Sequence, residues 1–309
     1  MAYCNQCGKL LGGPYCSGCG APAGREVSSP NPPPTAGWSR PSVTVESLRS
    51  PGERKALWVG LGSLAATSLL LDFSTAGIAL VATGALVIYV LFQQGALKGG
   101  GVAVSPRNFQ EVDALAQEAA TRLNIVKPNL FIQQSEELNA YALGFVGASS
   151  FVVLHSAIVY ASEASPKELQ FIIGHEFTHV KCSHVLWQTI AAKNPVIGRI
   201  PVLNVVLSFF FSWWSRQAEF TADRGGLIAC GDLAASQRAL ARLAIGRELF
   251  NRLNVEEFIK QAQDGDVTTS ANELFSSHPL LAKRILALAD FAQSPLVMGL
   301  NRPATSAVA

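Results

Sequence analysis

Residues 165–179 read Ser-Pro-Lys-Glu-Leu-Gln-Phe-Ile-Ile-Gly-His-Glu-Phe-Thr-His, and this stretch decides the fold. Residues 165–168 have the pattern of a capping box with a proline in the first turn, so they predict the start of a helix. On that helix His175 and His179 lie one turn apart on the same face, where both imidazoles can meet one zinc ion. Glu176 then projects beside them, toward a water molecule on that metal. The alternative is a pair of helix-face histidines that only form hydrogen bonds.

A zinc ion that activates water needs a third protein ligand and an open position. The segment Glu219-Phe-Thr-Ala-Asp223 begins about 40 residues after His179 and continues in a helical pattern. Its two carboxylates therefore face the same way. We expect Glu219 to bind the metal and Asp223 to accept the ring N–H of a ligating histidine. Alternatively, both could pair with Arg216 or Arg224 on a solvated face.

The chain carries four short motifs: Asn139-Ala140-Tyr141, His175-Glu-Phe-Thr-His179, Glu219-Phe-Thr-Ala-Asp223 and His278-Pro-x-x-x-x-Arg284. Together they resemble the HtpX-like and CAAX-prenyl-protease family of membrane zinc metallopeptidases, over most of residues 105–289. The resemblance implies a zincin-type peptidase domain, here placed at residues 103–295. It also implies a catalytic zinc bound by His175, His179 and Glu219.

The resemblance assigns roles to residues around the zinc. Glu176 would act as general base, taking a proton as water attacks the peptide carbonyl and returning it to the leaving amine. His278 and Arg284 match catalytic positions near the site and would donate to the developing negative charge. The alternative for these two is a helix-capping histidine and a surface arginine.

Substrate binding is assigned to Asn139, Ala140 and Tyr141. They precede a strand predicted at residues 151–154, which in the family is the edge along which an extended substrate adds as a further strand. His155 follows this strand and departs from the small polar residue of the family pattern. We expect it to be an exposed residue at the strand end.

The longer, C-terminal part of the chain combines helical and strand patterns. Residues 110–124 have apolar side chains at helical spacing, and residues 129–133 and 150–154 are short runs typical of strands. Helical patterns dominate after Ser165. We therefore expect an α+β, mainly helical domain with a small sheet, followed by a flexible tail at residues 296–309.

Two apolar runs, about residues 56–71 and 73–92, predict a transmembrane helical hairpin at residues 56–92. The second run is long enough to span about 30 Å of hydrocarbon, and the first is a few residues short. Basic residues flank the hairpin on both sides, and its turn has none. The positive-inside rule then places both ends on the cytoplasmic side of the cell membrane. The alternative is a buried hairpin in the core of a soluble protein.

The first twenty residues hold two C-x-x-C pairs: Cys4, Cys7, Cys16 and Cys19. Each pair precedes a glycine that tolerates a tight knuckle, and two knuckles can hold one structural zinc with four thiolates. We therefore expect a zinc ribbon at residues 1–20, with a disulfide-stapled knot as the alternative. The proline-, serine- and glycine-rich residues 21–55 predict a disordered linker.

The segment between the second and third ligands is apolar over residues 185–214. Its longest uninterrupted run, residues 202–214, is too short to span a membrane. We expect a membrane-touching or re-entrant hairpin, with a second pair of spans as the alternative. His184 is expected to lie off the ligand face and to flank this segment. Cys182 and Cys230 are expected to be buried as small hydrophobic residues.

Hydrophobic residues make up 49% of the chain and charged residues 15%, which fits burial of apolar surface in lipid as well as in a core. The net charge of +2 gives no electrostatic basis for nucleic-acid binding. We predict a membrane-anchored zinc endopeptidase that cleaves protein or peptide substrates, in particular misfolded membrane proteins, with prenyl-peptide cleavage less favoured. The alternative is a zinc-ribbon adaptor whose degenerate peptidase domain binds proteins without cleaving them. The ribbon is a candidate site for a protein partner, and a transporter has only the apolar content in its favour.

Overall fold

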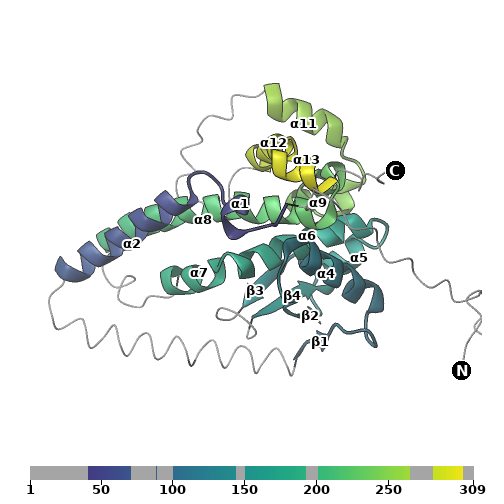
Figure 1. The fold of residues 1–309 in the computed structure, drawn as a ribbon, viewed down its shortest axis with the longest axis horizontal. Helices are drawn as coiled ribbons and strands as arrows, with labels where there is room; N and C mark the ends of the chain where they lie inside the picture. The colour runs from purple at the N-terminus through teal and green to yellow at the C-terminus, as the bar shows by residue number, and fades with distance from the viewer. Residues whose placement is uncertain are drawn as a thin grey trace, which may run out of the picture. The chain divides into compact units, whose positions relative to one another are not determined.

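The computed structural model describes residues 41–70, 88, 100–143, 150–192, 201–264 and 281–301 of the 309-residue chain (Figure 1). These residues belong to one unit, Pro41–Pro303. The zinc ribbon predicted at residues 1–20 lies outside the described residues. It stays a prediction.

The described helices are α1 (Val45–Leu48), α2 (Glu53–Leu70), α4 (Gln110–Leu123), α5 (Ser156–Ala161), α6 (Pro166–Lys181), α7 (His184–Ala192), α8 (Pro201–Cys230), α9 (Leu233–Ile245), α10 (Arg247–Phe250), α11 (Val255–Asp264), α12 (Leu281–Ala292) and α13 (Pro295–Asn301). The strands are β1 (Val102–Ala103), β2 (Asn129–Gln133), β3 (Ala140–Leu143) and β4 (Phe151–His155). The predicted mainly helical domain with a small sheet is confirmed.

The four strands form one mixed sheet in the order β1-β2-β4-β3. β2 and β4 pair in parallel, with Asn129 opposite Phe151, whereas β1 and β3 pair antiparallel at the two edges. Every residue of β4 is buried, as expected for a central strand rich in β-branched residues. The prediction that this strand is the edge is therefore wrong. Residues 140–143, which the sequence did not identify as a strand, pair with it and form the edge.

The most extensive helix contact joins α6 to α8, and glycines allow the two backbones to approach closely. A Cβ atom on Gly225 of α8 would lie 1.7 Å from Oγ1 of Thr178 on α6. Similarly, a Cβ on Gly174 of α6 would lie 2.3 Å from the Cβ of Ala229. The two helices are packed so closely that a larger residue does not fit at either glycine. This close crossing brings the predicted third ligand on α8 next to the two histidines of α6.

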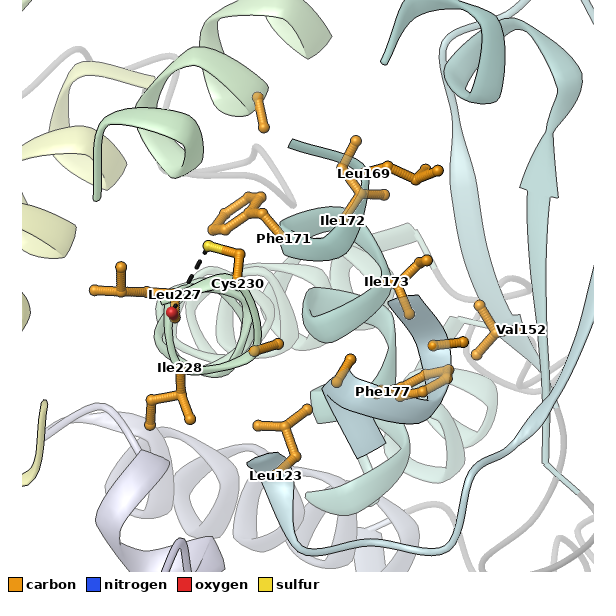
Figure 2. Packing of buried hydrophobic residues seen from close by; sticks show 14 of the residues in the cluster. Leu123, Val152, Leu169, Phe171, Ile172, Ile173, Phe177, Leu227, Ile228 and Cys230 are labelled. Carbon is orange, nitrogen blue, oxygen red and sulfur yellow. Dashed lines mark hydrogen bonds between the residues drawn. The ribbon is translucent and has the colours of Figure 1, made fainter. Parts of the chain in front are cut away.

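A hydrophobic core surrounds this crossing. Figure 2 shows side chains of α6, α8, α4 and β4 that meet there, among them Phe171, Ile172, Ile173, Phe177, Leu227, Ile228, Leu123 and Val152. The helix predicted at residues 110–124 is confirmed as α4 and contributes its buried apolar face to this core. Burying each large aliphatic side chain stabilises the fold by about 1.5–3 kcal/mol, so the core holds α6 and α8 in a fixed relation.

Helix α2 lies along the N-terminal part of α8 (Figure 1). Ala56 of α2 packs with Phe211, Trp214 and Ala218 of α8 in a second, smaller cluster. The apolar run at residues 202–214 therefore belongs to a helix of 30 residues that continues into the predicted metal-binding segment.

Two segments predicted to be unstructured are folded where the structure describes them. Residues 41–55, the end of the predicted linker, form α1 and the first turn of α2, and they bury Val43 and Leu48. Residues 295–301, at the start of the predicted tail, form α13 with Val297 buried. The first segment has few apolar residues and the second is only seven residues long, so neither has a recognisable pattern, but the rest of the domain covers their buried side chains.

The capping box predicted at residues 165–168 does not form. Helix α6 begins at the expected position, but Ser165 makes no side-chain cap hydrogen bond to this described helix. Glu168 is buried and instead binds Arg238 at 3.0 Å and Arg242 at 2.9 Å, both from α9. A buried carboxylate without a charged partner destabilises the fold strongly, so Glu168 pairs with the two arginines and does not cap the helix.

The predicted membrane hairpin is described only in part. Its first run forms most of α2, whereas its second run lies outside the described residues apart from Ile88. Within the described ranges, none of the helices combines the length and the apolar character that crossing a membrane requires. The hairpin stays a prediction.

Candidate metal centre

His175, His179 and Glu219 direct their side chains to one point between α6 and α8. Nε2 of His175 and Nε2 of His179 lie 3.1 Å apart. The carboxylate oxygens of Glu219 approach each of these nitrogens to 3.6 Å. One potential ligand atom from each residue lies within 4.8 Å of the others. The structure thus brings together the three residues that the sequence selected.

The chemistry and spacing of this cluster fit a zinc ion. Zinc binds imidazole nitrogen and carboxylate oxygen at roughly 2.0–2.2 Å, so two ligand atoms in tetrahedral geometry lie roughly 3.3–3.6 Å apart. The observed separations of 3.1 and 3.6 Å are close to this value. Three protein ligands also leave one position for water, as a catalytic zinc site requires.

A carboxylate on α8 holds the second ring nitrogen of His175. Nδ1 of His175 lies 3.0 Å from Oδ1 of Asp223, whose side chain is almost fully buried. Because Nε2 faces the ligand cluster, Nδ1 carries the proton and donates it to Asp223. Burial lowers the pKa of His175, but the hydrogen bond to Asp223 and the neighbouring carboxylates outweigh burial and raise it above its usual value.

Arg284 of α12 binds both carboxylates of α8. Its Nε and Nη2 lie 2.8 and 2.6 Å from the two carboxylate oxygens of Asp223, and its Nη1 lies 3.3 Å from Glu219. Burial lowers the pKa of Arg284, but the charges of Asp223 and Glu219 outweigh burial and raise it, so the guanidinium stays charged. The sequence predicted a donor to the reacting oxygen, whereas these contacts favour a role in fixing the carboxylates.

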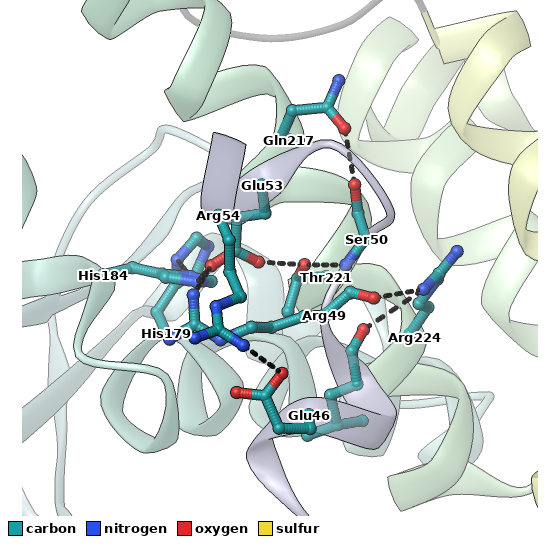
Figure 3. A network of polar contacts seen from close by, with 11 residues as sticks. Glu46, Arg49, Ser50, Glu53, Arg54, His179, His184, Gln217, Thr221 and Arg224 are labelled. Atoms are coloured by element: carbon teal, nitrogen blue, oxygen red, sulfur yellow. Dashed lines mark hydrogen bonds and ion pairs between the residues drawn. The ribbon is translucent and has the colours of Figure 1, made fainter. Parts of the chain in front are cut away.

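His179 is oriented through a second histidine (Figure 3). Ser183 has a left-handed backbone, with φ of 59°, and turns the chain between α6 and α7. This turn places Nδ1 of His184 at 3.0 Å from Nδ1 of His179. On its other side, Nε2 of His184 lies 3.2 Å from Oε1 of Glu53, and both side chains are fully buried. His184 begins α7 and stays outside the ligand cluster, as expected, but its contacts with His179 and Glu53 were not foreseen.

Glu53 is the first residue of α2 and is held by a network of polar contacts (Figure 3). Arg49 donates to its Oε1 at 2.7 Å, and the hydroxyl of Thr221 donates to its Oε2. The same hydroxyl accepts the backbone N–H of Ser50 at 2.8 Å. Arg224 donates to the carbonyl oxygen of Arg49 at 2.7 Å. The turn before α2 is thus tied to α8 through Thr221 and Arg224.

Burial and neighbouring charges set the protonation on this side of the site. Burial raises the pKa of Glu53, but the hydrogen bonds from His184 and Thr221, with the charge of Arg49, outweigh burial and lower it. Burial holds the pKa of His179 well below its usual value, and the nearby His175 acts in the same direction. Glu53 is therefore ionised and His179 neutral near pH 7. Neutral imidazole is the form that binds a metal.

Glu176 follows His175 directly on α6 and is buried. Its negative charge contributes to the raised pKa values of His175 and Arg284, so it lies within electrostatic reach of both. A carboxylate beside the ligand cluster but outside the ligand set is suited to accept a proton from a metal-activated water.

The predicted substrate residues Asn139, Ala140 and Tyr141 lie at the start of the edge strand β3 and just before it. The hydroxyl of Tyr141 donates to Gln133 at 3.1 Å, and burial raises its pKa. Tyr141 also packs edge-to-face on His155, with ring centroids 5.8 Å apart. His155 is therefore buried, not exposed as predicted, because β3 pairs with β4 and covers its end.

Two of the remaining predicted positions are described, and five lie outside the described residues. Cys182 and Cys230 are buried free thiols, as predicted. Burial raises the pKa of Cys182 to about 12. His278 and the four ribbon cysteines lie outside the described residues, so their roles stay predictions.

Comparison with known proteins identifies the family. Residues 106–292, more than half of the chain, match Peptidase family M48. The chain belongs to peptidase family M48. This confirms the resemblance inferred from the four motifs and places the chain among the metallopeptidases, whose M48 members depend on zinc.

Relatives of this M48 peptidase occur in plants and bacteria. It is 31% identical over 213 residues to Plastoglobule-localized metallopeptidase 48, chloroplastic, of Arabidopsis thaliana, covering 63% of this chain and 61% of that protein. It is 28% identical over 228 residues to Protease HtpX homolog of Moorella thermoacetica, covering 60% of this chain and 73% of that protein. Protease HtpX of Pasteurella multocida is 27% identical over 266 residues, with 74% and 89% covered.

One solved structure also aligns with the M48 chain. The crystal structure of S. mikatae Ste24p is 17% identical, with a TM-score of 0.43, and the alignment covers 76% of this chain and 61% of that one. The chain spans less than two thirds of the length of both this protein and the Arabidopsis relative.

The motifs of this M48 peptidase identified the three clustered residues but missed Glu53 and His184. His184 comes five residues after His179, a spacing that on a continuous helix would turn it away, and the turn at Ser183 could not be foreseen. Glu53 is 131 positions from His184 and stands at the end of the predicted linker, just before the predicted membrane hairpin. The only sequence signal for their role was that each of these two polar residues stands beside an apolar run, where a buried polar residue needs a partner.

Proposed function

We propose that this M48 peptidase is a zinc-dependent endopeptidase anchored in a membrane. The carrying observation is the convergence of Nε2 of His175, Nε2 of His179 and the carboxylate of Glu219 at zinc-ligand spacing. Membership of a metallopeptidase family supports the reaction. The buried carboxylate of Glu176 beside the cluster supports general-base catalysis.

The chain's own residues divide the work of hydrolysis. When bound at this site, zinc would lower the pKa of a water molecule toward neutrality and polarise the carbonyl to be cleaved. Glu176 accepts the proton of the attacking water and passes it to the leaving amine. Asp223 keeps the proton of His175 on Nδ1, which leaves Nε2 for the metal. Arg284 offsets the two negative charges of α8 and keeps Glu219 in place.

We propose that the substrate is an extended polypeptide that pairs with β3. This strand is an edge in the described sheet, and it contacts α6, which carries the two histidines. Main-chain hydrogen bonds along an edge strand depend little on side chains, so they accept many sequences. That tolerance fits the cleavage of misfolded chains, and it gives Asn139, Ala140 and Tyr141 their substrate-binding role. Relatives named Protease HtpX support proteolysis in general.

The membrane anchor is proposed at residues 56–92. Helix α2 supports this anchor in two ways. Its sequence is apolar, and its Trp58 has 68% of its surface exposed. Tryptophan is favoured at membrane interfaces. Basic residues on both sides of the hairpin support a cytoplasmic peptidase domain. Resistance to alkaline carbonate extraction is the expected result in fractionated cells, and release into the soluble fraction would contradict the anchor.

The ribbon cysteines are proposed to hold a second, structural zinc and to recruit a protein partner or substrate. The two C-x-x-C pairs support this. The double variant Cys4→Ser/Cys7→Ser should lose one zinc per chain and still cleave a generic unfolded protein. Loss of that cleavage would instead make the ribbon part of the catalytic unit.

The function is tested by cleavage of an unfolded reporter protein by the full chain purified in detergent. Cleavage should stop when a chelator removes zinc and return when zinc is restored. Glu176→Gln should abolish cleavage, because it removes the proton acceptor but not a ligand. Glu163→Gln, the same substitution at an exposed position, is the matched control and should cleave normally. A wild-type chain that holds zinc but cleaves nothing would favour the adaptor alternative.

A further inference from the structure

We propose that Glu53 and His184 are positioning residues of the metal centre, which fix the tautomer and the orientation of the ligand His179. This inference rests on the proposed zinc site of His175, His179 and Glu219. It adds to that site a hydrogen-bonded chain, His179 to His184 to Glu53, that begins at a ligand and ends at the first residue of α2 (Figure 3).

The direction of the hydrogen bonds follows from the atoms that face each other. Nε2 of His179 points to the ligand cluster, so it must be unprotonated to bind a metal, and the ring proton is on Nδ1. Nδ1 of His184 lies 3.0 Å away and accepts this proton in a hydrogen bond. A neutral imidazole has one N–H, so the proton of His184 is on Nε2, which donates to Glu53 at 3.2 Å.

An ionised carboxylate must end this chain for the direction to hold. Glu53 accepts from Arg49 at 2.7 Å and from the hydroxyl of Thr221. That hydroxyl already accepts the N–H of Ser50, so its own proton is available to Glu53. All the groups that contact Glu53 thus donate to it, and a protonated Glu53 would lose this match.

Packing fixes the ring of His184 as firmly as the hydrogen bonds do. The side chain has no exposed surface. Its ring meets that of His179 edge-to-face, with centroids 5.0 Å apart, and meets the ring of Trp214 in the same manner at 6.0 Å. A ring held on two sides can present only one nitrogen to His179, so it acts as a rigid spacer.

The two histidine ligands are each backed by a carboxylate, one directly and the other through a second histidine. Behind each ligand lies a buried carboxylate that also binds an arginine. For His175 the carboxylate is Asp223, which contacts the ring directly. For His179 it is Glu53, with His184 between them. A hydrogen-bonded carboxylate behind a ligating histidine orients the ring and raises its basicity, and this explains why the chain buries Glu53.

The zinc affinity of the full chain in detergent tests this inference, measured by competition with a chromophoric chelator. The double variant His175→Ala/His179→Ala gives the blank for zinc held elsewhere. Glu53→Gln keeps the shape but removes the charge, and His184→Asn keeps an acceptor near His179 but cannot reach Glu53. Each should weaken zinc binding about 10-fold, the lower end of the range for such hydrogen-bonded partners. The visible absorption spectrum of the Co²⁺-loaded site should also change, because a reoriented His179 alters the ligand field.

Ser50→Ala is the matched control in the same turn. It removes the contact of 2.5 Å between the Ser50 hydroxyl and Gln217 but keeps the backbone N–H that binds Thr221. Its zinc affinity and cobalt spectrum should equal those of the wild type. A loss as large as that of Glu53→Gln would overturn the inference, because it would show an effect of packing alone.

Two further outcomes separate this inference from the proposed function. If Glu53→Gln does not fold, His184→Asn decides, since it leaves the pair of Glu53 and Arg49 in place. Wild-type zinc affinity and an unchanged cobalt spectrum in His184→Asn would overturn the inference alone. A wild-type chain that binds no more zinc than the blank would overturn the proposed function, and the inference with it.

Discussion

His175 and His179 lie one turn apart on α6, but the groups that orient them come from different parts of the chain. The side of His175 is built from α8 and α12, where Asp223 stands one turn after Glu219 and Arg284 binds both. The side of His179 is built from the turn after α6 and from the start of α2. The carboxylate that contacts His175 therefore shares a helix with Glu219, whereas the carboxylate behind His179 lies in a segment more than a hundred residues away.

This difference bears on what each side contributes. On the His175 side, one carboxylate orients the ring and also binds a buried arginine, so its loss affects the metal and the fold together. On the His179 side, a neutral ring separates the charge from the ligand. Substitution of Glu53 should therefore lower the zinc affinity less than substitution of Asp223. Matched substitutions can compare the two sides.

The largest effect is expected for Asp223→Asn, which breaks the direct side. Zinc affinity should fall about 10–100-fold because His175 loses its orienting carboxylate. The free energy of unfolding of the zinc-free chain should also fall by about 3–5 kcal/mol, because the buried Arg284 loses the charge that it pairs with. Chelator competition and denaturant unfolding measure the two effects. An unfolding free energy equal to that of the wild type would show that Arg284 does not depend on Asp223.

Next in size is Gly225→Ala, which disturbs both sides at once. The added methyl group would lie 1.7 Å from Oγ1 of Thr178, which is fully buried, so α6 and α8 must separate. The free energy of unfolding should fall by about 1–3 kcal/mol or more, as measured by denaturant unfolding. Gly100→Ala, where nothing lies within 4 Å of the new atom, is the control and should be close to neutral. Equal stability of the two variants would contradict the close crossing.

A smaller effect concerns pH and isolates the side of His179. Because the pKa of Glu53 lies below its usual value of 4.5, its ionised form stabilises the folded state above that pH. This stabilisation is lost as the pH falls below about 4.5. In the zinc-free chain, the fall in unfolding free energy with falling pH should be shallower in Glu53→Gln than in the wild type. Glu163→Gln should keep the wild-type slope, and a slope unchanged in Glu53→Gln would refute the role of its charge.

The smallest effect uses Cys182 as a reporter of local opening near Glu53. The pKa of about 12 leaves roughly one thiolate in ten thousand at pH 8, so the native thiol should resist alkylation. Part of this raised pKa comes from the charge of Glu53, which places the two near each other. Glu53→Gln removes this charge and so lowers the pKa of Cys182. Its alkylation, measured by peptide mass spectrometry, should be a few-fold faster. Cys230, at the far end of α8, should label at the wild-type rate, and parallel acceleration of both would indicate global unfolding.

The sequence predicted the local side of the site and missed the distant one, for a physical reason. Helical periodicity predicted that His175 and His179 share one helix face and that Glu219 and Asp223 share another. The helix α4 and the strands β2 and β4 were identified from the same kind of local pattern. These predictions use only neighbours along the chain, whereas the meeting of the two helices was expected from the need of zinc for a third ligand and from the family resemblance.

The errors arise where tertiary contacts override local signals. Glu168 fits a capping box but binds two arginines of α9. Residues 41–55 resemble a linker, but a few buried side chains and Glu53 fasten them to α8. The edge of the sheet was assigned to β4, because the short β3 carries no strand signal of its own. None of these contacts has a spacing that a single sequence can reveal.

One paired measurement tests the central claim most directly: bound zinc and cleavage rate in Glu176→Gln and Glu219→Gln, determined on the same preparations. We expect Glu176→Gln to hold catalytic zinc as tightly as the wild type and not to cleave. We expect Glu219→Gln to lose both that zinc and cleavage. Wild-type cleavage by Glu176→Gln, or wild-type zinc affinity in Glu219→Gln, would contradict the roles assigned to these two carboxylates.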